Sequence, residues 1–416
     1  MKLLCISHDN NIWGAPRSLA GIMAELEKTT DWDIQVLVRS RSSHGRIIDF
    51  GANHKTTFWQ PAVKQGVNNN QSRPNARMIL GSIKRLRIGK ALKMAKFWAC
   101  SAFEKSEDEH HKDVAKKMRK WAPDVIYSNT AVNMDVLAAL AIDAPVVVHV
   151  RELDWFLSAL SPEAKRIFQT VPEKYLCVSN AVKTNLIENY DIPADRCHIV
   201  PVGLNVDMIM NSAAERSPES VRGELGLKED DFVITMCGTL DKRKGWELVV
   251  GACRHLTSMC GTGSKPCFVW IGDGGDRAEF EQAMHEAGWD SRLRITGATK
   301  NPYVYMAAAD LQLTPSLDDP FPRVNLEAAC LGKPVVAFKP SGGSAEFVGN
   351  DAGVVVNSFD AEELAQVLLN AKLGKLDLEG MGQAGSRKVK RSYTVERVSS
   401  LAREYIRTAA SAPAAD

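Results

Sequence analysis

The sequence contains no long apolar run, no paired cysteine motif and no excess of one charge. A membrane-spanning helix needs about 20 mainly apolar residues, and the apolar start of the chain turns polar after Ser7, too early for a signal peptide. The nine cysteines are odd in number, scattered and without a Cys-x-x-Cys pair, which disfavours disulfides and a zinc site. The net charge is only +2, so nucleic acid is not an expected partner. From these absences we expect a cytoplasmic globular protein, and 416 residues give room for two domains.

Short β-branched runs alternate with amphipathic helical stretches along the chain, which is typical of parallel sheets covered by helices on both faces. A stretch from about 199 to 220 separates two sets of such runs and predicts a hinge and linker. We expect an α/β fold with two doubly wound parallel-sheet domains, 1–203 and 204–392, and a final helix, about 393–410, that packs back on the first. The predicted strands are 2–7, 34–38, 125–127, 146–150, 175–178, 233–237, 267–271, 293–296, 311–313, 335–338 and 353–355.

Two carboxylates flank a predicted helix start between Asp319 and Glu327. Pro322 suits the first helical position, because its ring fixes φ and its missing N–H needs no partner there. Gly332 suits the left-handed residue that follows a helix. The free amides and the positive dipole end of such a helix attract phosphate, while Glu327, one turn in, can accept hydrogen bonds from a diol such as ribose. An ordinary strand-loop-helix unit with an acidic loop is the alternative.

Two other loops follow predicted strands, where ligands of doubly wound sheets bind. The first holds Gly14 in a turn that leads into a predicted helix, 19–26, whose N-terminus can face a phosphate. The second holds three consecutive cations at 242–244, where the fork of Arg243 and the point charge of lysine can neutralise a diphosphate. A solvated charge run is the alternative. The turn at 272–276 lacks the full Gly-x-Gly-x-x-Gly pattern, so a close-packed turn explains it equally well.

Several short motifs occur in a fixed order between about residues 176 and 359. In this order they resemble the retaining glycosyltransferases of family 4, the group 1 transferases, which have the GT-B fold. In that family the paired acids are written Glu-x7-Glu; here Asp319 fills the first position and Glu327 the second. The motifs that carry the resemblance are Val178-Ser179-Asn180-Ala181-Val182, Lys244-Gly245, Ile271-Gly272-Asp273-Gly274, Thr296-Gly297, Ala309-Asp310, Pro315-Ser316, Leu326-Glu327-Ala328 and Gly332-Lys333-Pro334-Val335-Val336.

The resemblance implies a GT-B architecture, in which two Rossmann-like domains face a central cleft. Glu327 would hold the nucleotide ribose, and Asp319 would contact hydroxyl groups of the transferred sugar. Lys244 and Arg243 would neutralise the leaving diphosphate. Backbone amides at the helix start would contact the same diphosphate, and the glycine loop of the other domain would cover it. The implied residues of the sugar-nucleotide site are Gly14, Arg243, Lys244, Asp319, Arg323, Val324 and Glu327.

Three departures from the family pattern bear on this expectation. An arginine that is common in the family's Gly-Arg-Leu segment is Thr239 here, so its charge either comes from Lys242 or Arg243 or is missing. Asp319 is one methylene shorter than the usual glutamate, which affects the preferred sugar. Pro322 removes one amide that other members offer to the diphosphate.

The family's histidine near the sugar has two candidate positions at the end of one predicted strand. Counting from Pro145 places it at Arg151, whereas His149 lies two residues earlier and so on the same face of the strand. We expect one of the two, together with Asp319, to act on the reacting sugar. The alternative is that His149 is a satisfied core histidine and that Arg151 forms an ion pair with Glu152.

These features predict a retaining transferase that moves a sugar from a nucleotide diphosphate sugar to a glycan or lipid-linked glycan, in bacterial polysaccharide or lipopolysaccharide synthesis. Such transfer needs a stabilised leaving diphosphate and a site that excludes water. No nucleophile and no Asp-x-Asp metal motif is apparent, so we expect no metal and no cofactor. The residues favour neither UDP nor GDP. A GT-B epimerase or phosphorylase and a non-catalytic sugar-nucleotide-binding partner subunit are the alternatives.

Between Phe50 and Phe103 the chain has ten Lys or Arg residues and no acidic residue. Within this part, residues 77–98 mix apolar residues and cations in a helical rhythm, as basic interfacial helices do. Each basic group near anionic lipid contributes about 1 kcal/mol, so this segment is expected to hold the protein at the inner face of the membrane. A solvated face of an ordinary helix is the alternative.

Overall fold

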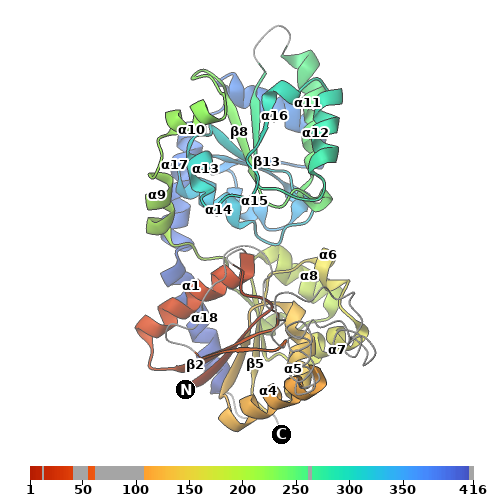
Figure 1. Ribbon diagram of the computed structural model, residues 1–416, viewed down its shortest axis with the longest axis vertical. Coiled ribbons are helices and arrows are strands. Elements are labelled where there is room, and N and C mark those ends of the chain that lie inside the picture. Colours follow the sequence, from red (N-terminus) through yellow and green to blue (C-terminus); the bar gives the residue numbers. More distant parts are fainter. Residues whose placement is uncertain (12–13, 41–54, 61–106, 261–264, 412–416) are drawn as a thin grey trace, which may run out of the picture.

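The computed structural model describes residues 1–11, 14–40, 55–60, 107–260 and 265–411, which form two α/β lobes (Figure 1). Within these residues, each lobe is built around one parallel sheet, with seven strands in the first lobe and six in the second. The strands are β1 (Lys2–Ser7), β2 (Asp33–Val38), β3 (Lys55–Phe58), β4 (Val125–Ser128), β5 (Val146–Val150), β6 (Lys174–Cys177), β7 (Cys197–Ile199), β8 (Val233–Cys237), β9 (Cys267–Ile271), β10 (Leu293–Ile295), β11 (Leu311–Thr314), β12 (Val335–Phe338) and β13 (Gly353–Val356).

Both sheets have the strand order of a doubly wound fold. The order is β3-β2-β1-β4-β5-β6-β7 in the first lobe and β10-β9-β8-β11-β12-β13 in the second. The order therefore reverses between β1 and β4, and again between β8 and β11. The carboxyl ends of the strands flank a crevice at each reversal, which is where such sheets bind ligands. The predicted fold class, two doubly wound parallel sheets, is confirmed.

All the predicted strands are present, with ends that agree to within one residue. They were predictable because helices cover both faces of a parallel sheet, so a central strand is a nearly continuous apolar run. In β1, Leu4 and Ile6 belong to the core on one face of the sheet, and Leu3 and Cys5 to the core on the other. The strands β3 and β7 were not predicted. Both are short edge strands and mostly only half buried, so their apolar pattern is weak.

The helices of the described residues connect these strands. The helix that follows Gly14 begins at Gly14 itself, five residues before its predicted start, and ends at Thr29. The helices are α1 (Gly14–Thr29), α4 (Glu107–Trp121), α5 (Met134–Leu140), α6 (Asp154–Leu157), α7 (Pro162–Thr170), α8 (Asn180–Tyr190), α9 (Val206–Ala213), α10 (Pro218–Glu224), α11 (Trp246–Met259), α12 (Arg277–Glu286), α13 (Tyr303–Ala307), α14 (Arg323–Cys330), α15 (Ser344–Val348), α16 (Ala361–Lys372), α17 (Leu378–Ser392) and α18 (Val395–Ala410).

The chain passes between the lobes twice, and the two passages are hydrogen-bonded to each other. The Leu204 N–H donates to the Tyr393 carbonyl, and the Val395 N–H donates to the Leu204 carbonyl, both at 2.8 Å. The second passage leads into α18, which packs against α1 and the central strands of the first sheet (Figure 1). We propose these passages as the hinge between an N-terminal domain, 1–203 with 393–410, and a C-terminal domain, 204–392.

The stretch that follows the first passage is helical, which corrects the prediction of a linker as far as about residue 220. The Asn205 side chain caps α9 by accepting from the Met208 N–H at 2.9 Å. Ser217 caps α10 in the same way, and Pro218 occupies its first turn. Polar capping residues and a proline at a helix start are also typical of loops, which explains the difference.

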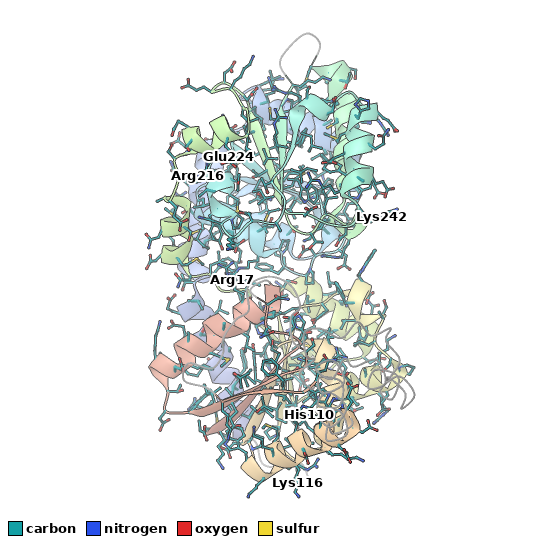
Figure 2. The ribbon with its side chains drawn as sticks, viewed as in Figure 1. Arg17, His110, Lys116, Arg216, Glu224 and Lys242 are labelled. Carbon is teal, nitrogen blue, oxygen red and sulfur yellow. The ribbon has the colours of Figure 1, made fainter. Side chains whose placement is uncertain are left out.

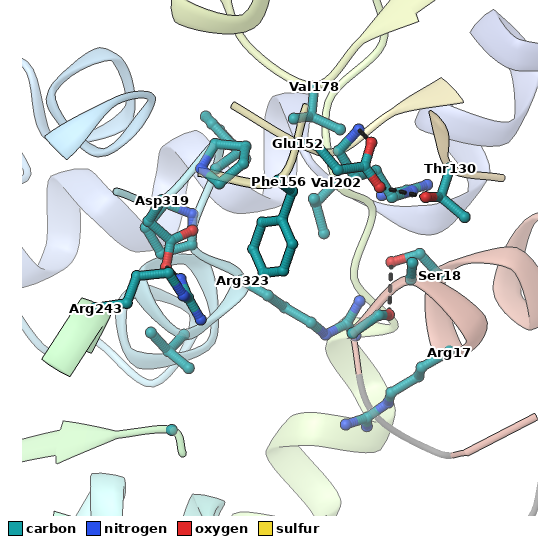
Figure 3. Close-up of a pocket in the computed structure, with 18 of the residues that line it drawn as sticks. Arg17, Ser18, Thr130, Glu152, Phe156, Val178, Val202, Arg243, Asp319 and Arg323 are labelled. Atoms are coloured by element: carbon teal, nitrogen blue, oxygen red, sulfur yellow. Dashed lines mark hydrogen bonds and ion pairs between the residues drawn. The ribbon is translucent and has the colours of Figure 1, made fainter. Parts of the chain in front are cut away.

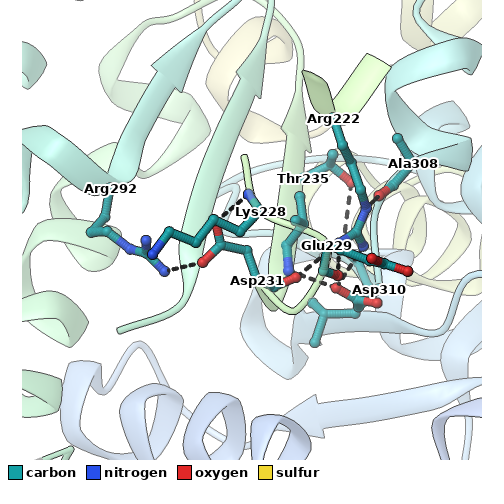
Figure 4. Close-up of polar contacts among 10 residues, drawn as sticks. Arg222, Lys228, Glu229, Asp231, Thr235, Arg292, Ala308 and Asp310 are labelled. Atoms are coloured by element: carbon teal, nitrogen blue, oxygen red, sulfur yellow. Dashed lines mark hydrogen bonds and ion pairs between the residues drawn. The ribbon is translucent and has the colours of Figure 1, made fainter. Parts of the chain in front are cut away.

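A polar network fixes the amino ends of β8 and β11, away from the crevice (Figure 4). Arg222 donates to Asp310 (Nη2 to Oδ2, 3.2 Å) and to the carbonyl oxygens of Ala308 and Asp231 (2.9 Å each). The Asp310 carboxylate also accepts from the Val233 N–H at 2.6 Å, at the start of β8. The motif residue Asp310 therefore holds two neighbouring strands in register and lies outside the candidate site.

In the described part of the chain, no helix has the length and apolarity needed to cross a membrane. The cysteines of this part are free thiols, as predicted. The basic segment 77–98 lies outside the described residues, so its interfacial helix stays a prediction.

Candidate active site

A cavity of about 630 Å³ lies between the two lobes, at the carboxyl ends of the strands. Its wall includes loops that follow β1, β4 and β5 on the N-terminal side and β8 and β11 on the C-terminal side, so both strand-order reversals open into it. Figure 3 shows Arg243, Asp319 and Arg323 on one side of this space and Thr130 and Glu152 on another. A concave site with several convergent polar groups at such reversals is the expected position for a small-molecule ligand.

Lys244 and Asp319 form an ion pair in the C-terminal wall of the cavity. The distance from Nζ to Oδ2 is 2.7 Å, and the side chains are only 15% and 11% exposed. Arg243 lies beside the pair, because its Nη1 is 4.0 Å from the same Oδ2 and donates to the Asp318 carbonyl at 2.9 Å. The structure therefore brings three predicted residues together, and charge pairing ties the loop after β8 to the loop after β11.

The turn η3 (Lys242–Lys244) is held in place by the residues on either side of it. The Asp241 side chain accepts from the Lys244 N–H at 3.1 Å. Gly245 has a φ of +69°, and a Cβ there would lie 2.0 Å from the Pro315 carbonyl oxygen. Only glycine therefore allows this turn to lie against the loop after β11. Lys242 is exposed on the outer side of the lobe (Figure 2), so the three cations do not act as one group.

One oxygen of Glu327 accepts two hydrogen bonds within the C-terminal domain and forms an ion pair with the N-terminal domain. Arg323 Nε lies 2.8 Å from Oε1, and the Tyr303 hydroxyl donates to the same oxygen at 3.1 Å. Arg17, in the first turn of α1, brings its Nη1 to 3.8 Å and lies over the Tyr303 ring. The glutamate is only 5% exposed. Its rotamer is thus fixed by two arginines, one of which comes from across the cavity.

The helix α14 begins at Arg323, and Pro322 is its N-cap, with φ −62° and ψ 113°. The prediction that Pro322 is the first helical residue is wrong by one position, because its extended ψ places it outside the helix. Its missing N–H therefore falls before the first turn, and the amides of Arg323 and Val324 remain at the helix start, in the cavity wall. The Asn325 N–H closes the first turn onto the Pro322 carbonyl at 3.1 Å. Gly332 follows the helix with a φ of +73°, as predicted.

Gly14 is the first residue of α1 and lies in the cavity wall. Its φ of +53° is a conformation that L side chains rarely adopt. The first turn of α1, which begins at Gly14, places Arg17 beside Glu327. The structure thus brings the predicted glycine turn to the same cavity as the C-terminal residues, from the opposite domain.

Arg151 lies in the cavity wall, but it does not pair with the Glu152 carboxylate through its side chain. Its Nε donates to Asn129 Oδ1 at 3.3 Å, and only its backbone N–H donates to Glu152, at 2.8 Å. Glu152 also accepts from the Thr130 hydroxyl and from the Ala131 N–H. Burial raises the pKa of Glu152, which these three donors oppose. Glu152 therefore ties the loops after β4 and β5 together.

His149 does not reach the cavity, which corrects its prediction as a residue that acts on the sugar. It is fully buried, and its Nε2 lies 2.8 Å from the Val200 carbonyl, so Nε2 carries the proton. Nδ1 then accepts from the Tyr127 hydroxyl at 2.6 Å and from Arg151 Nη2 at 3.2 Å. Burial, and next the charge of Arg151, lowers the pKa of His149 well below its usual value. It is a neutral core histidine that contacts Arg151.

Several side chains of the cavity wall were not predicted as site residues from the sequence, among them His8, Arg17 and Phe156. His8 directly follows β1 at the strand-order reversal, and that position is the signal that identifies it. Burial is the main cause that lowers the pKa of His8, and its buried Nδ1 has no partner among the described residues. Phe156 reaches the cavity through the packing of α6, and the buried Tyr303 of α13 reaches Glu327. No local pattern indicates either contact.

The donor atoms of this site do not form a metal centre. Within the described ranges, no group of three or more His, Cys, Asp or Glu side chains is placed to hold a metal ion. The cavity instead presents arginine and lysine side chains next to carboxylates, which suits an anionic ligand that also carries hydroxyl groups.

Two family models match the chain. The model for glycosyl transferases group 1 matches residues 218–388, and the model for glycosyltransferase family 4 matches residues 107–208. Together they cover the C-terminal wall and most of the N-terminal wall of the cavity. The chain belongs to the group 1 glycosyltransferases. Its predicted family is therefore confirmed, together with the GT-B fold.

Curated relatives match the sequence of this chain over part of its length. A D-inositol 3-phosphate glycosyltransferase of Corynebacterium jeikeium is 30% identical over 52% of this chain and 53% of its own length. The lipopolysaccharide core biosynthesis glycosyltransferase LpsD of Rhizobium meliloti is 28% identical over 39% of this chain and 46% of its own. The chain thus spans about half the length of the curated relatives it matches.

Solved structures match the fold over nearly the whole chain. HepE of Anabaena in complex with UDP-glucose has a TM-score of 0.72 at 18% identity, covering 98% of this chain and 100% of its own. WaaG, a glycosyltransferase involved in lipopolysaccharide biosynthesis, has a TM-score of 0.68 at 16% identity, covering 98% and 99%. At these identities the likeness establishes the architecture.

Proposed function

We propose that this protein moves a sugar from a nucleoside diphosphate sugar to a hydroxyl group of a glycan or lipid-linked glycan. We also propose that transfer retains the anomeric configuration and uses no metal. The observation that carries the proposal is the convergence of Lys244, Arg243, Glu327 and the start of α14 on one interdomain cavity. The UDP-glucose held by the structural neighbour HepE supports this class of sugar donor.

The C-terminal wall has the groups that a leaving diphosphate needs. As the bond to the sugar breaks, negative charge grows on the diphosphate, and fixed cations stabilise that charge better than water does. Lys244 and Arg243 would supply them, with the amides of Arg323 and Val324 and the dipole of α14. The Asp319 carboxylate would hold the Lys244 ammonium in the cavity and accept from a hydroxyl of the sugar.

Glu327 would bind the nucleotide ribose. Its Oε1 is held by Arg323 and Tyr303, so its second oxygen is fixed in direction and would accept from the ribose diol. A carboxylate that is held in one rotamer loses little entropy when the ligand binds.

The acceptor would enter from the N-terminal wall. Arg151 takes the position of the family's histidine, and its guanidinium would orient a hydroxyl group of one of the two sugars. His149 would act only through Arg151, by accepting from its Nη2. Closure of the two domains over this space would exclude the water that otherwise hydrolyses the sugar donor.

A role in lipopolysaccharide or other polysaccharide synthesis is supported by the similarity to LpsD and WaaG, which are named for lipopolysaccharide biosynthesis. We propose that the protein works at the cytoplasmic face of the membrane and that residues 77–98 bind anionic lipid. Co-sedimentation with vesicles of anionic lipid tests this proposal. Reversing the charges of Lys84, Arg85 and Arg87 should abolish binding, and unchanged binding would refute the membrane role.

A thermal-shift screen of UDP, GDP and their sugars tests the proposed site. A ligand at about 100 times its dissociation constant stabilises the folded state by about 2.7 kcal/mol. We expect one nucleoside diphosphate to raise the melting temperature, and Lys244→Ala to lose most of that shift while Lys242→Ala keeps it. Lys242 is the matched control, because it belongs to the same turn but points away from the cavity. A screen in which neither diphosphate stabilises the protein would contradict the proposed function.

A further inference from the structure

The short helix α6 exposes two adjacent aromatic side chains, of which Phe156 lines the cavity. Trp155 is 55% exposed and Phe156 is 44% exposed. Among the large apolar side chains exposed in the described residues, the only other aromatic one is Phe359. Full burial of a large apolar side chain stabilises by about 1.5–3 kcal/mol, so two half-exposed aromatic rings leave part of this stabilisation unrealised. Exposed apolar groups gathered beside a cavity are typical of a binding surface.

Both domains contact the short helix that carries the two aromatic residues. Leu157, the last residue of α6, is fully buried, and Asp154 accepts from the Tyr190 hydroxyl at 3.0 Å. The Trp155 N–H donates to Asp318 Oδ2 in the C-terminal domain at 3.4 Å. The Arg243 guanidinium lies 5.7 Å from the centre of the Phe156 ring. Figure 3 shows Phe156 pointing into the cavity between Val178 and Arg323.

Asp318 brings an unused hydrogen-bond acceptor to the same place. Its Oδ2 accepts from Trp155, but its Oδ1 is buried and has no partner in the described part of the chain. Buried polar atoms are rarely left unpaired, so this oxygen indicates a group that binds there. Burial is the main cause that raises the pKa of Asp318, and the nearby carboxylates of Asp319 and Asp154 raise it further.

We propose that Trp155, Phe156 and Asp318 form a subsite for an uncharged sugar ring of the acceptor. A pyranose has an apolar face of C–H groups, which packs on aromatic rings, and an edge of hydroxyl groups, which donate to a carboxylate. The subsite adjoins Asp319, so a sugar bound there lies next to the proposed position of the transferred sugar. This inference rests on the proposed function and specifies its acceptor.

The surrounding charges favour an uncharged sugar over a phosphate-bearing acceptor and over an anionic lipid surface. The Asp318 carboxylate next to Trp155, with that of Asp154 nearby, disfavours a phosphate-bearing acceptor. The Arg243 guanidinium faces Phe156 and donates to the Asp318 carbonyl, and it is reserved in the proposed function for the diphosphate of the sugar donor. The same carboxylates would repel an anionic lipid surface, so the two rings are not the expected membrane contact.

Saturation-transfer NMR on the full chain, saturated with the nucleoside diphosphate that stabilises it, tests the subsite. The probes are methyl α-D-glucopyranoside, methyl β-D-galactopyranoside, methyl α-D-mannopyranoside and myo-inositol 1-phosphate. We expect at least one methyl glycoside to bind and the inositol phosphate to bind more weakly. Trp155→Ala should weaken the bound glycoside about fivefold, in keeping with one aromatic contact, and Trp155→Phe should restore part of the loss.

The matched control is Phe359→Ala, which removes an exposed aromatic ring away from the cavity and should leave glycoside binding unchanged. Asp318→Asn should weaken the glycoside while the nucleotide still binds. The proposal is overturned if no methyl glycoside binds, if Trp155→Ala binds it as tightly as the wild type, or if the inositol phosphate binds more tightly. If no nucleoside diphosphate stabilises the wild type, the proposed function itself is refuted, so the two failures are distinguishable.

Discussion

The two walls of the cavity have the same sheet topology but use their polar groups differently. In the C-terminal wall, charged side chains pair with one another: Lys244 with Asp319, and Arg323 with Glu327. In the N-terminal wall, Glu152 is satisfied by a hydroxyl and backbone amides, and behind this wall the buried His149 is satisfied by a carbonyl and two side-chain donors. Ion pairs can exchange partners with a charged ligand, whereas a satisfied buried network cannot do so without losing hydrogen bonds. The first wall is therefore suited to bind and release a diphosphate, and the second to act as a fixed frame.

The largest expected effect is that of Lys244→Ala on turnover. Removing a group that stabilises developing charge typically lowers the rate by about 10²–10³-fold, so hydrolysis of the sugar nucleotide should fall by this factor. The fold should persist, because the side chain is at the cavity surface. Release of nucleoside diphosphate measures the rate, with Lys242→Ala as the control; near-normal turnover in Lys244→Ala would refute the assignment of the C-terminal wall.

Glu327→Gln should weaken the binding of the nucleoside diphosphate by about tenfold or more, because hydrogen bonds to a charged group contribute about 1.5–3 kcal/mol. Glutamine keeps the volume and can still accept from Tyr303, so the melting temperature of the free protein should change little. Calorimetric titration measures the affinity. The same affinity as the wild type would exclude Glu327 from contact with the ribose.

His149→Gln should change the pH dependence of stability. The pKa of His149 is lowered in the folded protein, so below about pH 6.5 the unfolded chain binds a proton that the folded chain does not. Stability conferred by the neutral histidine is therefore present above that pH and is lost as the pH falls, at up to about 1.4 kcal/mol per pH unit. Urea unfolding at pH 7 and pH 5 should show a smaller difference for His149→Gln than for the wild type. Equal differences would contradict the buried, neutral state.

Arg17→Met should have the smallest effect. Its guanidinium is 3.8 Å from Glu327 and 25% exposed, and such ion pairs contribute about 0.2–1 kcal/mol. We expect a shift of nucleotide affinity of less than about fivefold by titration. A change as large as that of Glu327→Gln would show that the two walls are coupled more strongly than their contacts indicate.

The sequence predicted the C-terminal wall well because its signals are local. The strands β8 and β11 are buried apolar runs, and the cations and carboxylates that follow them lie in the loops where a doubly wound sheet binds its ligand. The position of Pro322 was wrong by one residue, since a proline is compatible with both the N-cap and the first helical position.

The N-terminal wall was predicted less well because its geometry depends on contacts between distant segments. The neutral state of His149 is set by Tyr127 and by the Val200 carbonyl, which lie 22 and 51 residues away in the chain. Phe156 reaches the cavity because α6 is anchored by Tyr190 and Asp318. No pattern within a single segment specifies such contacts.

The central claim is that the C-terminal wall neutralises a diphosphate. Titration of the wild type and of Lys244→Ala with the selected nucleoside diphosphate and with its nucleoside tests this claim most directly. If the claim holds, the wild type binds the diphosphate at least about a hundredfold more tightly than the nucleoside, and most of that ratio is lost in Lys244→Ala. An unchanged ratio in the variant would contradict it.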